Sequence, residues 1–251
     1  MKIIFPEIES NPIAKAAASH FNDIEFLAAD NLNEAAKAIA DGEADSMISG
    51  LDHSSRDVLL AYKDNITLKS NYFSSCFIMK RQDYYLTLAD CAVNKLPSED
   101  QLYTTVEDTA KTHQAFFGTQ PKIAMLSYST HGSGGKNPDL EKIYNVIKRI
   151  EDNHPDWLID GEIQLDAAIV PEVANKKVPD SPLKGNANIL IVPELNTGNI
   201  LYKSMERFGG FTAAGPIIQG FAKPLADLSR GSTIEDVILT IEVIKKILER
   251  N

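Results

Sequence analysis

The sequence is poor in cysteine, tryptophan and histidine, and these shortages argue against several kinds of site. Its 251 residues include two cysteines, one tryptophan and five histidines. Cys76 and Cys91 are not spaced as a CxxC pair, and each stands in an apolar stretch, which is typical of reduced thiols in a cytosolic protein. The histidines are scattered without an HExxH motif, so we expect no zinc centre.

Long apolar runs and an excess of positive charge are also absent. The longest uncharged stretch, residues 208–222, contains four glycines and a proline and is shorter than a membrane-spanning helix. The first residues, MKIIFPEIESNPIAKAAA, lack the basic region, apolar core and cleavage site of a signal peptide. The 25 basic residues are outnumbered by 35 acidic ones, for a formal net charge of −10. The sequence therefore predicts a cytoplasmic protein without a nucleic-acid or membrane partner, whose anionic ligands must be met by local basic groups.

Short apolar runs alternating with helical patterns are abundant. Strand-like and helical segments alternate over residues 3–5, 12–21, 24–28, 32–40 and 46–49, and HSSRDVLLAY begins another helix. A β-rich segment, its expected partner, a helix, a strand and a further helix follow at residues 72–80, 86–93, 98–117, 123–127 and 140–151. This order is typical of an α/β protein with a parallel sheet. Ser232 and Glu235 match a capping box and predict the start of the last helix.

Polar turns follow several of these strands, where the N–H groups of a following helix can hold anions. The loop THGSGGKN is not a Walker A motif, because Thr130 stands where glycine is needed and Asn137 where serine or threonine is needed. Its hydroxyl groups could still donate hydrogen bonds to phosphate oxygens. The alternative is a polar turn that binds no ligand. The candidate anion ligands of this segment are Ser127, Ser129, Thr130 and Ser133.

The apolar run at residues 189–192 ends in a second polar turn. Amide-rich turns of this kind bind anions or simply cap a helix, and Lys203, one turn into the helix, favours anion binding. The candidate ligands of this turn are Asn196, Thr197, Gly198, Asn199 and Lys203.

The segment LSRGSTIEDV brings together the hydroxyl group of Ser229, the guanidinium group of Arg230 and the carboxylate of Asp236. Read alone, it is a capped helix with a charged first turn. A group of acids in an earlier strand-like segment, Asp160, Glu162 and Asp166, leaves a divalent-metal site open as an alternative.

Taken together, these segments resemble the phosphate acetyl/butyryltransferase family. The blocks AMLSYST, DGEIQLDAAIVPEVA, NTGNILYK, GPIIQG and DLSRG stand in the order found in that family, and the resemblance extends from about residue 44 to 248. It implies the two-domain α/β fold of isocitrate and isopropylmalate dehydrogenases, with the active site in the interdomain cleft and a homodimer. Residues 1–66 plus 224–251 are then expected to form one domain, and residues 67–223 the other.

The resemblance also implies a reaction, the reversible transfer of a short acyl group between coenzyme A and phosphate through attack of a thiolate on an acyl phosphate. Coenzyme A is a substrate, and neither a bound cofactor nor a metal is implied. In this reading Asp236 accepts the thiol proton, Ser229 donates a hydrogen bond to the developing charge, and Arg230 holds phosphate oxygens. Gln219, in the GPIIQG block, is expected to contact substrate with the polar residues named above.

The chain departs from the family at two arginine positions. The route from Phe26 to Ala44 is short and contains no arginine, and Leu60 stands where the family has another. Arg56 lies one helical turn earlier on nearly the same face, so we expect it to reach the same anion. Two alternatives follow: a homologue that binds acyl-CoA or acyl phosphate without turnover, and a dehydrogenase of this fold with magnesium at Asp160, Glu162 and Asp166.

Overall fold

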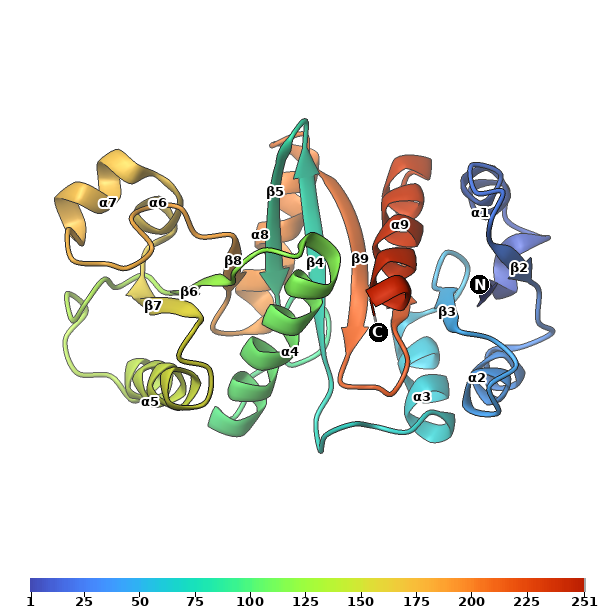
Figure 1. Ribbon diagram of the computed structural model, residues 1–251, viewed down its shortest axis with the longest axis horizontal. Coiled ribbons are helices and arrows are strands. Elements are labelled where there is room, and N and C mark those ends of the chain that lie inside the picture. The colour runs from blue at the N-terminus through green and yellow to red at the C-terminus, as the bar shows by residue number, and fades with distance from the viewer. Residues whose placement is uncertain (251) are drawn as a thin grey trace.

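One mixed sheet of ten strands organises the fold in the computed structural model, which describes residues 1–250 (Figure 1). The strand order is β2-β1-β3-β10-β9-β4-β5-β8-β6-β7. The strands are β1 (Lys2–Ile4), β2 (Glu25–Leu27), β3 (Ser46–Ser49), β4 (Ser74–Arg81), β5 (Tyr84–Ala89), β6 (Lys122–Leu126), β7 (Leu158–Ile163), β8 (Ile189–Ile191), β9 (Thr212–Gln219) and β10 (Leu225–Asp227).

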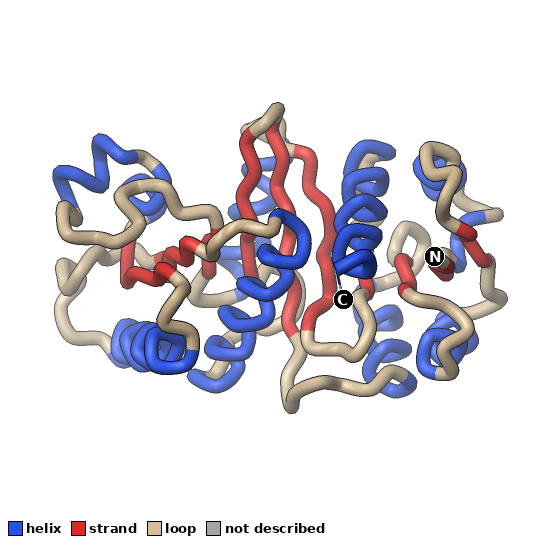
Figure 2. The backbone as a smooth tube through the Cα atoms, viewed as in Figure 1, coloured by secondary structure: helices blue, strands red, loops and turns tan. Residues whose placement is uncertain are grey.

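Helices lie on both sides of this row of strands (Figure 2). They are the 3-10 helix η1 (Pro6–Ile8) and the α-helices α1 (Pro12–Ala18), α2 (Leu32–Ala40), α3 (Ser55–Asn65), α4 (Glu99–Phe117), α5 (Pro138–Asn153), α6 (Leu165–Ile169), α7 (Pro171–Lys177), α8 (Leu195–Arg207) and α9 (Ile234–Arg250). Helix α9 packs on β9, α1 and α4, so the end of the chain returns to its beginning. None of the helices described has the length and apolar character needed to span a bilayer.

The sheet is parallel in its two outer parts and antiparallel at its centre. Strands β2, β1, β3 and β10 pair in parallel, and so do β5, β8, β6 and β7. Between them, β9 runs antiparallel to both β10 and β4, and β4 forms a hairpin with β5. The parallel sheet expected from the alternation of strands and helices thus forms the two outer parts, and the expected pairing of residues 72–80 with 86–93 is confirmed by the β4–β5 hairpin. The sequence did not predict β9, the long antiparallel strand that the uncharged segment after residue 208 adds at the centre.

The N-terminus of α9 is capped one residue later than the sequence pattern predicts. The Thr233 hydroxyl group accepts a hydrogen bond from the Asp236 backbone N–H at 3.2 Å, and the Asp236 carboxylate accepts one from the Thr233 N–H at 2.8 Å. The capping box is therefore formed by Thr233 and Asp236, and the prediction of Ser232 with Glu235 is wrong. The two patterns overlap in STIED, and the Ser232 N–H instead closes a turn on the Ser229 carbonyl group at 2.9 Å.

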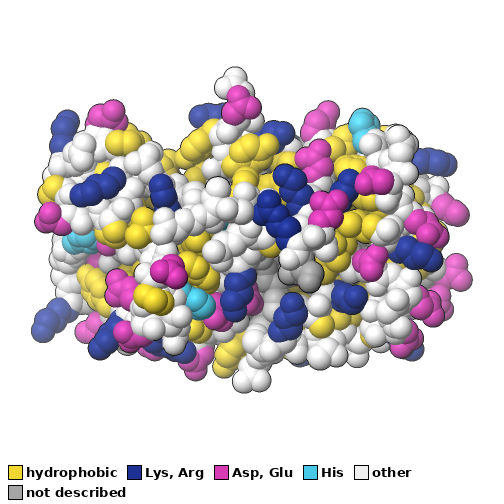
Figure 3. Space-filling view, in the orientation of Figure 1, with side chains coloured by type: hydrophobic (Ala, Val, Ile, Leu, Met, Phe, Trp, Pro, Cys, Tyr) yellow, Lys and Arg dark blue, Asp and Glu magenta, His cyan; other side chains and the backbone are white. Residues whose placement is uncertain are grey.

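The surface agrees with the acidic composition. On the face drawn in Figure 3, lysine and arginine side chains are interspersed with aspartate and glutamate and form no continuous basic area. Proteins that bind nucleic acid through the phosphate backbone present such an area.

Tyr62 ties α3 to the strand that leads into the candidate site. Its ring is fully buried, and its hydroxyl group donates a 2.7 Å hydrogen bond to the Ala226 carbonyl group on β10. We expect Tyr62→Phe to lower the free energy of unfolding by about 1–2 kcal/mol, because a buried acceptor loses its donor. Urea denaturation measures this change. Tyr84→Phe, at a position 42% exposed, is the control, and equal losses in both variants would contradict the assignment.

Candidate active site

A cavity of about 450 Å³ lies where the turn after β10 meets α8 and the loop after β3. We call it the Ser229 cavity. Its lining residues are Gly50, His53, Ser55, Ala92, Asn199, Tyr202, Lys203, Arg207, Pro216, Asp227, Leu228, Ser229, Arg230 and Gly231. Four of the residues singled out in the sequence therefore meet here: Asn199, Lys203, Ser229 and Arg230.

The turn that carries Ser229 and Arg230 is held by α8. Arg207, at the end of that helix, donates a 3.2 Å hydrogen bond to the Gly231 carbonyl group. The Ser229 hydroxyl group accepts a 3.2 Å bond from the Gly231 N–H, which leaves its own proton able to point at a ligand. Sequence reasoning missed Arg207. Its spacing of four residues from Lys203, which places both on one helix face, is the signal that could have found it.

Positive charge dominates this cavity. Lys203, Arg207 and Arg230 all line it, and each side chain is exposed. Arg207 is also within 3.0 Å of Glu206, an ion pair near solvent that water weakens. Guanidinium and ammonium groups at this density bind phosphate oxygens well. The cavity can therefore neutralise a dianion despite the acidic chain.

Asp227, a lining residue that sequence reasoning missed, supplies a carboxylate. Its side chain is 1% exposed, and within residues 1–250 neither carboxylate oxygen has a hydrogen bond of good geometry, although the Ser55 side chain lies close enough to favour the charged form. Burial raises the pKa of Asp227 to about 6, the Ser55 side chain opposes the rise, and Glu7 adds to it. The position of this aspartate directly before LSRG, at a strand end, is the sequence signal that could have found it. Its raised pKa follows from burial, which the sequence does not show.

Asp236 does not belong to the lining of this cavity. Its side chain is 3% exposed, and its oxygens accept hydrogen bonds of 2.8 Å from the Ala213 N–H and from the Thr233 N–H and hydroxyl group. The carboxylate thus fixes the start of α9 against β9. Its expected role as proton acceptor stays a prediction, and these contacts indicate a structural role.

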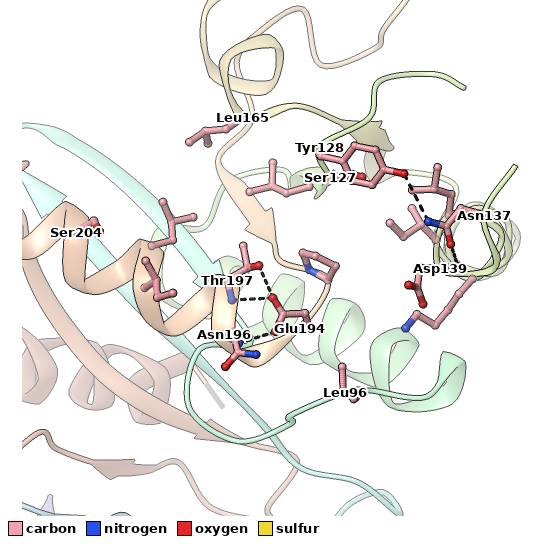
Figure 4. A pocket seen from close by; sticks show the side chains of 17 residues that line it. Leu96, Ser127, Tyr128, Asn137, Asp139, Leu165, Glu194, Asn196, Thr197 and Ser204 are labelled. Atoms are coloured by element: carbon pink, nitrogen blue, oxygen red, sulfur yellow. Dashed lines mark hydrogen bonds between the residues drawn. The ribbon is translucent and has the colours of Figure 1, made fainter. Parts of the chain in front are cut away.

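A second cavity, of about 710 Å³, lies on the other side of the N-terminal half of α8 (Figure 4). We call it the Tyr128 cavity. It is lined by Leu96, Leu126, Ser127, Tyr128, Asn137, Asp139, Leu140, Lys142, Ile143, Leu165, Pro193, Glu194, Asn196, Thr197, Ile200, Leu201 and Ser204. Three predicted ligands, Ser127, Asn196 and Thr197, line this cavity instead of the Ser229 cavity. The seven predicted residues that line the two cavities are therefore divided between the two sides of α8.

The N-terminus of α8 already has an anion. Glu194 accepts hydrogen bonds from the backbone N–H groups of Asn196 at 2.7 Å and Thr197 at 2.8 Å, as the dashed lines of Figure 4 show. The N–H groups that the sequence offers to a ligand are thus engaged by the protein itself. Asn196 and Thr197 stay predicted ligands, but the helix end is not an open cradle.

The hydroxyl-rich loop after β6 is bonded internally. Ser129 donates a 2.6 Å bond to Glu162 and accepts one of 2.6 Å from the Gly134 N–H. Thr130 accepts from the Gln164 N–H at 3.0 Å, and Ser133 accepts from the Thr130 N–H at 2.9 Å. Ser129, Thr130 and Ser133 line neither cavity described above, so their contacts indicate that they hold the loop.

The three acids that left a metal site open face different partners. Asp160 contacts His131 at 2.9 Å, Asp166 contacts Lys177 at 2.7 Å, and Glu162 bonds to Ser129. In the described part of the chain, no group of three histidine, cysteine or carboxylate residues is placed to hold a metal ion.

Three further predicted residues lie away from the Ser229 cavity lining. Arg56 is exposed on the first turn of α3. Gly198 marks the contact of α8 with the loop after β5, where an added Cβ would lie 2.5 Å from the Asp90 carbonyl oxygen. Gln219 accepts bonds of 3.1 Å from Ser74 and Thr109 and donates one of 2.9 Å to Thr112. These contacts indicate a structural role for Gln219, and its expected contact with substrate stays a prediction.

Gln219→Ala tests that reading. We expect a loss of about 1–3 kcal/mol in the free energy of unfolding, because buried hydroxyl groups lose their partner, while KM for substrates stays unchanged. Thermal denaturation and steady-state kinetics measure the two effects. Gln114→Ala, an exposed position on α4, is the control. A raised KM without a change in stability would instead support the predicted contact with substrate.

Known proteins similar to this chain are mainly phosphate acetyltransferases. A family model described as phosphate acetyl/butaryl transferase matches residues 13–244. The chain is 42% identical over 229 residues to a phosphate acetyltransferase from Clostridium acetobutylicum, covering 87% of this chain and 68% of that one. A phosphotransacetylase structure from Streptococcus pyogenes superposes with a TM-score of 0.88 at 31% identity, covering 100% of this chain and 94% of that one. A 4-hydroxythreonine-4-phosphate dehydrogenase from Klebsiella pneumoniae has a TM-score of 0.52 at 11% identity, covers 86% and 69% of the two chains, and shares the fold alone.

Proposed function

Because the chain belongs to the phosphate acetyl/butyryl transferase family, we propose that it transfers a short acyl group reversibly between coenzyme A and phosphate. The observation that carries this proposal is the meeting of Ser229, Arg230, Lys203 and Arg207 in one cavity. The fold is the dehydrogenase-like two-domain α/β type predicted from the sequence. We propose that residues 1–66 plus 224–251 and residues 67–223 are the two domains, and that the protein is cytoplasmic.

The cavity supplies what the reaction needs. An acyl phosphate is already activated, so the protein must orient it, stabilise the attacking thiolate and neutralise the departing phosphate. Arg230, Lys203 and Arg207 present positive charge to the phosphate oxygens, and the Ser229 hydroxyl group donates to the charge that develops during attack. The sulfur–carbon bond forms as the bond between the acyl carbon and the phosphate oxygen breaks.

The cations come from α8 and the turn before α9. The sequence instead predicts an anion contact from α3, where Leu60 replaces a family arginine and Arg56 lies one turn earlier. Arg56 is exposed and does not line the Ser229 cavity. Lys203 and Arg207 do line it, on the face of α8 that is turned away from the Tyr128 cavity. The proposal that this chain is active is therefore supported by cations that do not depend on α3.

A thioester-forming assay tests the proposal. Coenzyme A is incubated with acetyl, propionyl or butyryl phosphate, with and without a chelator, and thioester absorbance is followed. We expect turnover that the chelator does not change. A thermal shift with coenzyme A but without turnover would favour the non-catalytic binding homologue, and chelator-sensitive nicotinamide reduction would favour the dehydrogenase.

We also propose that the protein is a homodimer that buries the rim of the Tyr128 cavity. Leu96, Tyr128 and Ile200 on that rim are 81%, 66% and 65% exposed, an arrangement of apolar groups more typical of an interface than of free surface. We expect light scattering to give twice the chain mass of 27.6 kDa, and Ile200→Glu to give the monomer mass. Leu60→Glu, on α3, is the control. A monomeric wild type would contradict this assembly.

A further inference from the structure

A third cavity, of about 380 Å³, lies beside the two chain segments that connect the proposed domains. We call it the Lys223 cavity. The two connections are residues 67–70 and 220–223, and they pair with each other, because the Lys69 N–H donates a 2.7 Å hydrogen bond to the Gly220 carbonyl group. The middle of α4, the end of β9 and the end of α9 complete the lining. The cavity therefore touches both proposed domains at their junction.

The Lys223 cavity is separate from the Ser229 cavity. The two have no lining residue in common. On β9, Pro216 lines the Ser229 cavity, whereas the next residue, Ile217, lines the Lys223 cavity. Successive side chains of a strand point to opposite faces of a sheet. A ligand of the Lys223 cavity would therefore lie across β9 from the groups proposed to bind acyl phosphate.

Each connection brings an ammonium group to this cavity. Lys69 comes from the first connection, and Lys223, which is half-buried, comes from the second. Of the three lysines in the lining, only Lys111 has an ion pair within residues 1–250, at 3.1 Å from Glu107. A half-buried ammonium group without a partner is poorly solvated and favours an anionic oxygen. The two connections thus offer two cations to one ligand.

Asp108 brings a carboxylate to the same cavity from α4. Its Oδ2 atom is buried without a hydrogen-bond partner within residues 1–250, so Oδ1 is the atom that it presents to the cavity. Burial raises the pKa of Asp108 to about 6, Lys111 and Lys69 oppose the rise, and Glu107 adds to it. Most of this carboxyl group is therefore ionised at pH 7, and it can accept a hydrogen bond from a ligand.

The wall beside Asp108 is held in place by side-chain hydrogen bonds. The Thr112 hydroxyl group accepts a 2.9 Å bond from the Gln219 amide, which leaves its own proton able to point at a ligand. Gln219 in turn accepts bonds of 3.1 Å from Ser74 and Thr109. The GPIIQG block therefore contributes its glutamine to this cavity, where the amide fixes a donor.

The charges of the lining select a monoanion. Glu107 compensates Lys111, so Lys69 and Lys223 against Asp108 leave one positive charge in excess. A carboxylate next to the two ammonium groups balances that charge. A hydroxyl group on the neighbouring carbon atom supplies the donor that the aspartate lacks, and a cavity of this size holds only a small molecule.

We propose that the Lys223 cavity binds a small 2-hydroxycarboxylate, whose carboxylate contacts Lys69 and Lys223 and whose hydroxyl group donates to the Asp108 Oδ1 atom. The site goes beyond the acyl transfer proposed above and does not depend on it. A carboxylate held by both connections restrains their movement relative to each other. The ligand is therefore a regulator of how freely the two proposed domains move.

Calorimetry on the full chain with glycolate and acetate as probes tests the site. We expect one glycolate per chain, bound about tenfold more tightly than acetate, because acetate lacks the hydroxyl group that reaches Asp108. Lys223→Gln weakens the binding of both probes by about 10–100-fold. Asp108→Ala lowers the affinity for glycolate to that for acetate. Lys148→Gln, at an exposed position on α5, is the control and changes neither affinity.

Several results would overturn the proposal. They are a wild type that binds no glycolate or binds glycolate and acetate equally, and a Lys223→Gln variant with wild-type affinity. Loss of glycolate binding in Arg230→Gln but not in Lys223→Gln would place the ligand in the Ser229 cavity instead. If Lys223→Gln does not fold, Lys69→Gln, at an exposed position, makes the same test. Calorimetry needs no turnover, so a wild type without acyl transfer activity leaves this test intact, and the two failures are distinguishable.

Discussion

Arg230→Gln is expected to lower kcat/KM for acyl phosphate by about 10²–10³-fold, because the departing phosphate loses a guanidinium group of the Ser229 cavity. Glutamine keeps a hydrogen-bond donor but carries no charge, so the loss reports mainly on electrostatics. Steady-state kinetics with acetyl phosphate and coenzyme A measure it. Stability should change little, because the Arg230 side chain is exposed.

The matched control is Arg149→Gln. Arg149 pairs on the surface with Glu99 at 3.4 Å and Asp100 at 2.9 Å, far along the chain from the cavity-lining segments. Exposed ion pairs of this kind contribute little to stability. If both variants kept the wild-type kcat/KM, the Ser229 cavity would not be where phosphate binds.

Gly198→Ala is expected to impair both stability and activity. An added Cβ would meet the Asp90 carbonyl oxygen at 2.5 Å and the Val192 Cγ2 atom at 2.8 Å, so α8 must move away from the loop after β5. Overpacking of this kind costs about 1–3 kcal/mol. The displacement carries Lys203 and Arg207 with it, and we expect kcat/KM to fall more than about tenfold, since positioning errors near 1 Å are costly. Denaturation and kinetics measure the two effects.

Ser204→Ala on the same helix is the control for Gly198→Ala, because it removes an atom and adds none. We expect it to leave kcat/KM within about twofold of the wild type. A stable and fully active Gly198→Ala would mean that α8 and the loop after β5 can move apart without lowering the free energy of unfolding. Gly198 would then contribute through its backbone alone, as the sequence-based prediction of a ligand-binding turn has it.

The elements of the fold could largely be predicted from local pattern. Residues 32–40 form α2 with Asn31 as the cap, and residues 46–49 form β3, as their periodicity indicates. The expected pairing of residues 72–80 with 86–93 is found in the β4–β5 hairpin, but the position of β9 beside β4 escaped this reasoning because the two strands are distant in sequence. The α9 cap was misplaced by one residue because two overlapping motifs fit the sequence, and packing of the buried Val237 and Ile241 selects one.

The candidate site could be predicted only in part, for a similar reason. Sequence blocks identify Ser229, Arg230, Lys203 and Asn199, and the fold brings these four together. The hydroxyl groups of the loop after β6 also look like ligands, but their bonding to Glu162 and to backbone N–H groups depends on the tertiary fold. The burial and raised pKa of Asp227 could not be predicted for the same reason, because they depend on neighbours that only the tertiary fold brings together.

Helix α8 is a wall shared by two cavities, so the proposed subunit pairing and the proposed substrate binding would act on one element. A subunit that packs against the Tyr128 cavity would contact the same helix that carries Lys203 and Arg207 on its other side. By thermodynamic reciprocity, any factor by which subunit pairing tightens substrate binding is also the factor by which substrate tightens the pairing. If the proposed pairing tightens substrate binding, dilution into the monomer regime weakens the apparent affinity for acyl phosphate, with no residue of the Ser229 cavity changed.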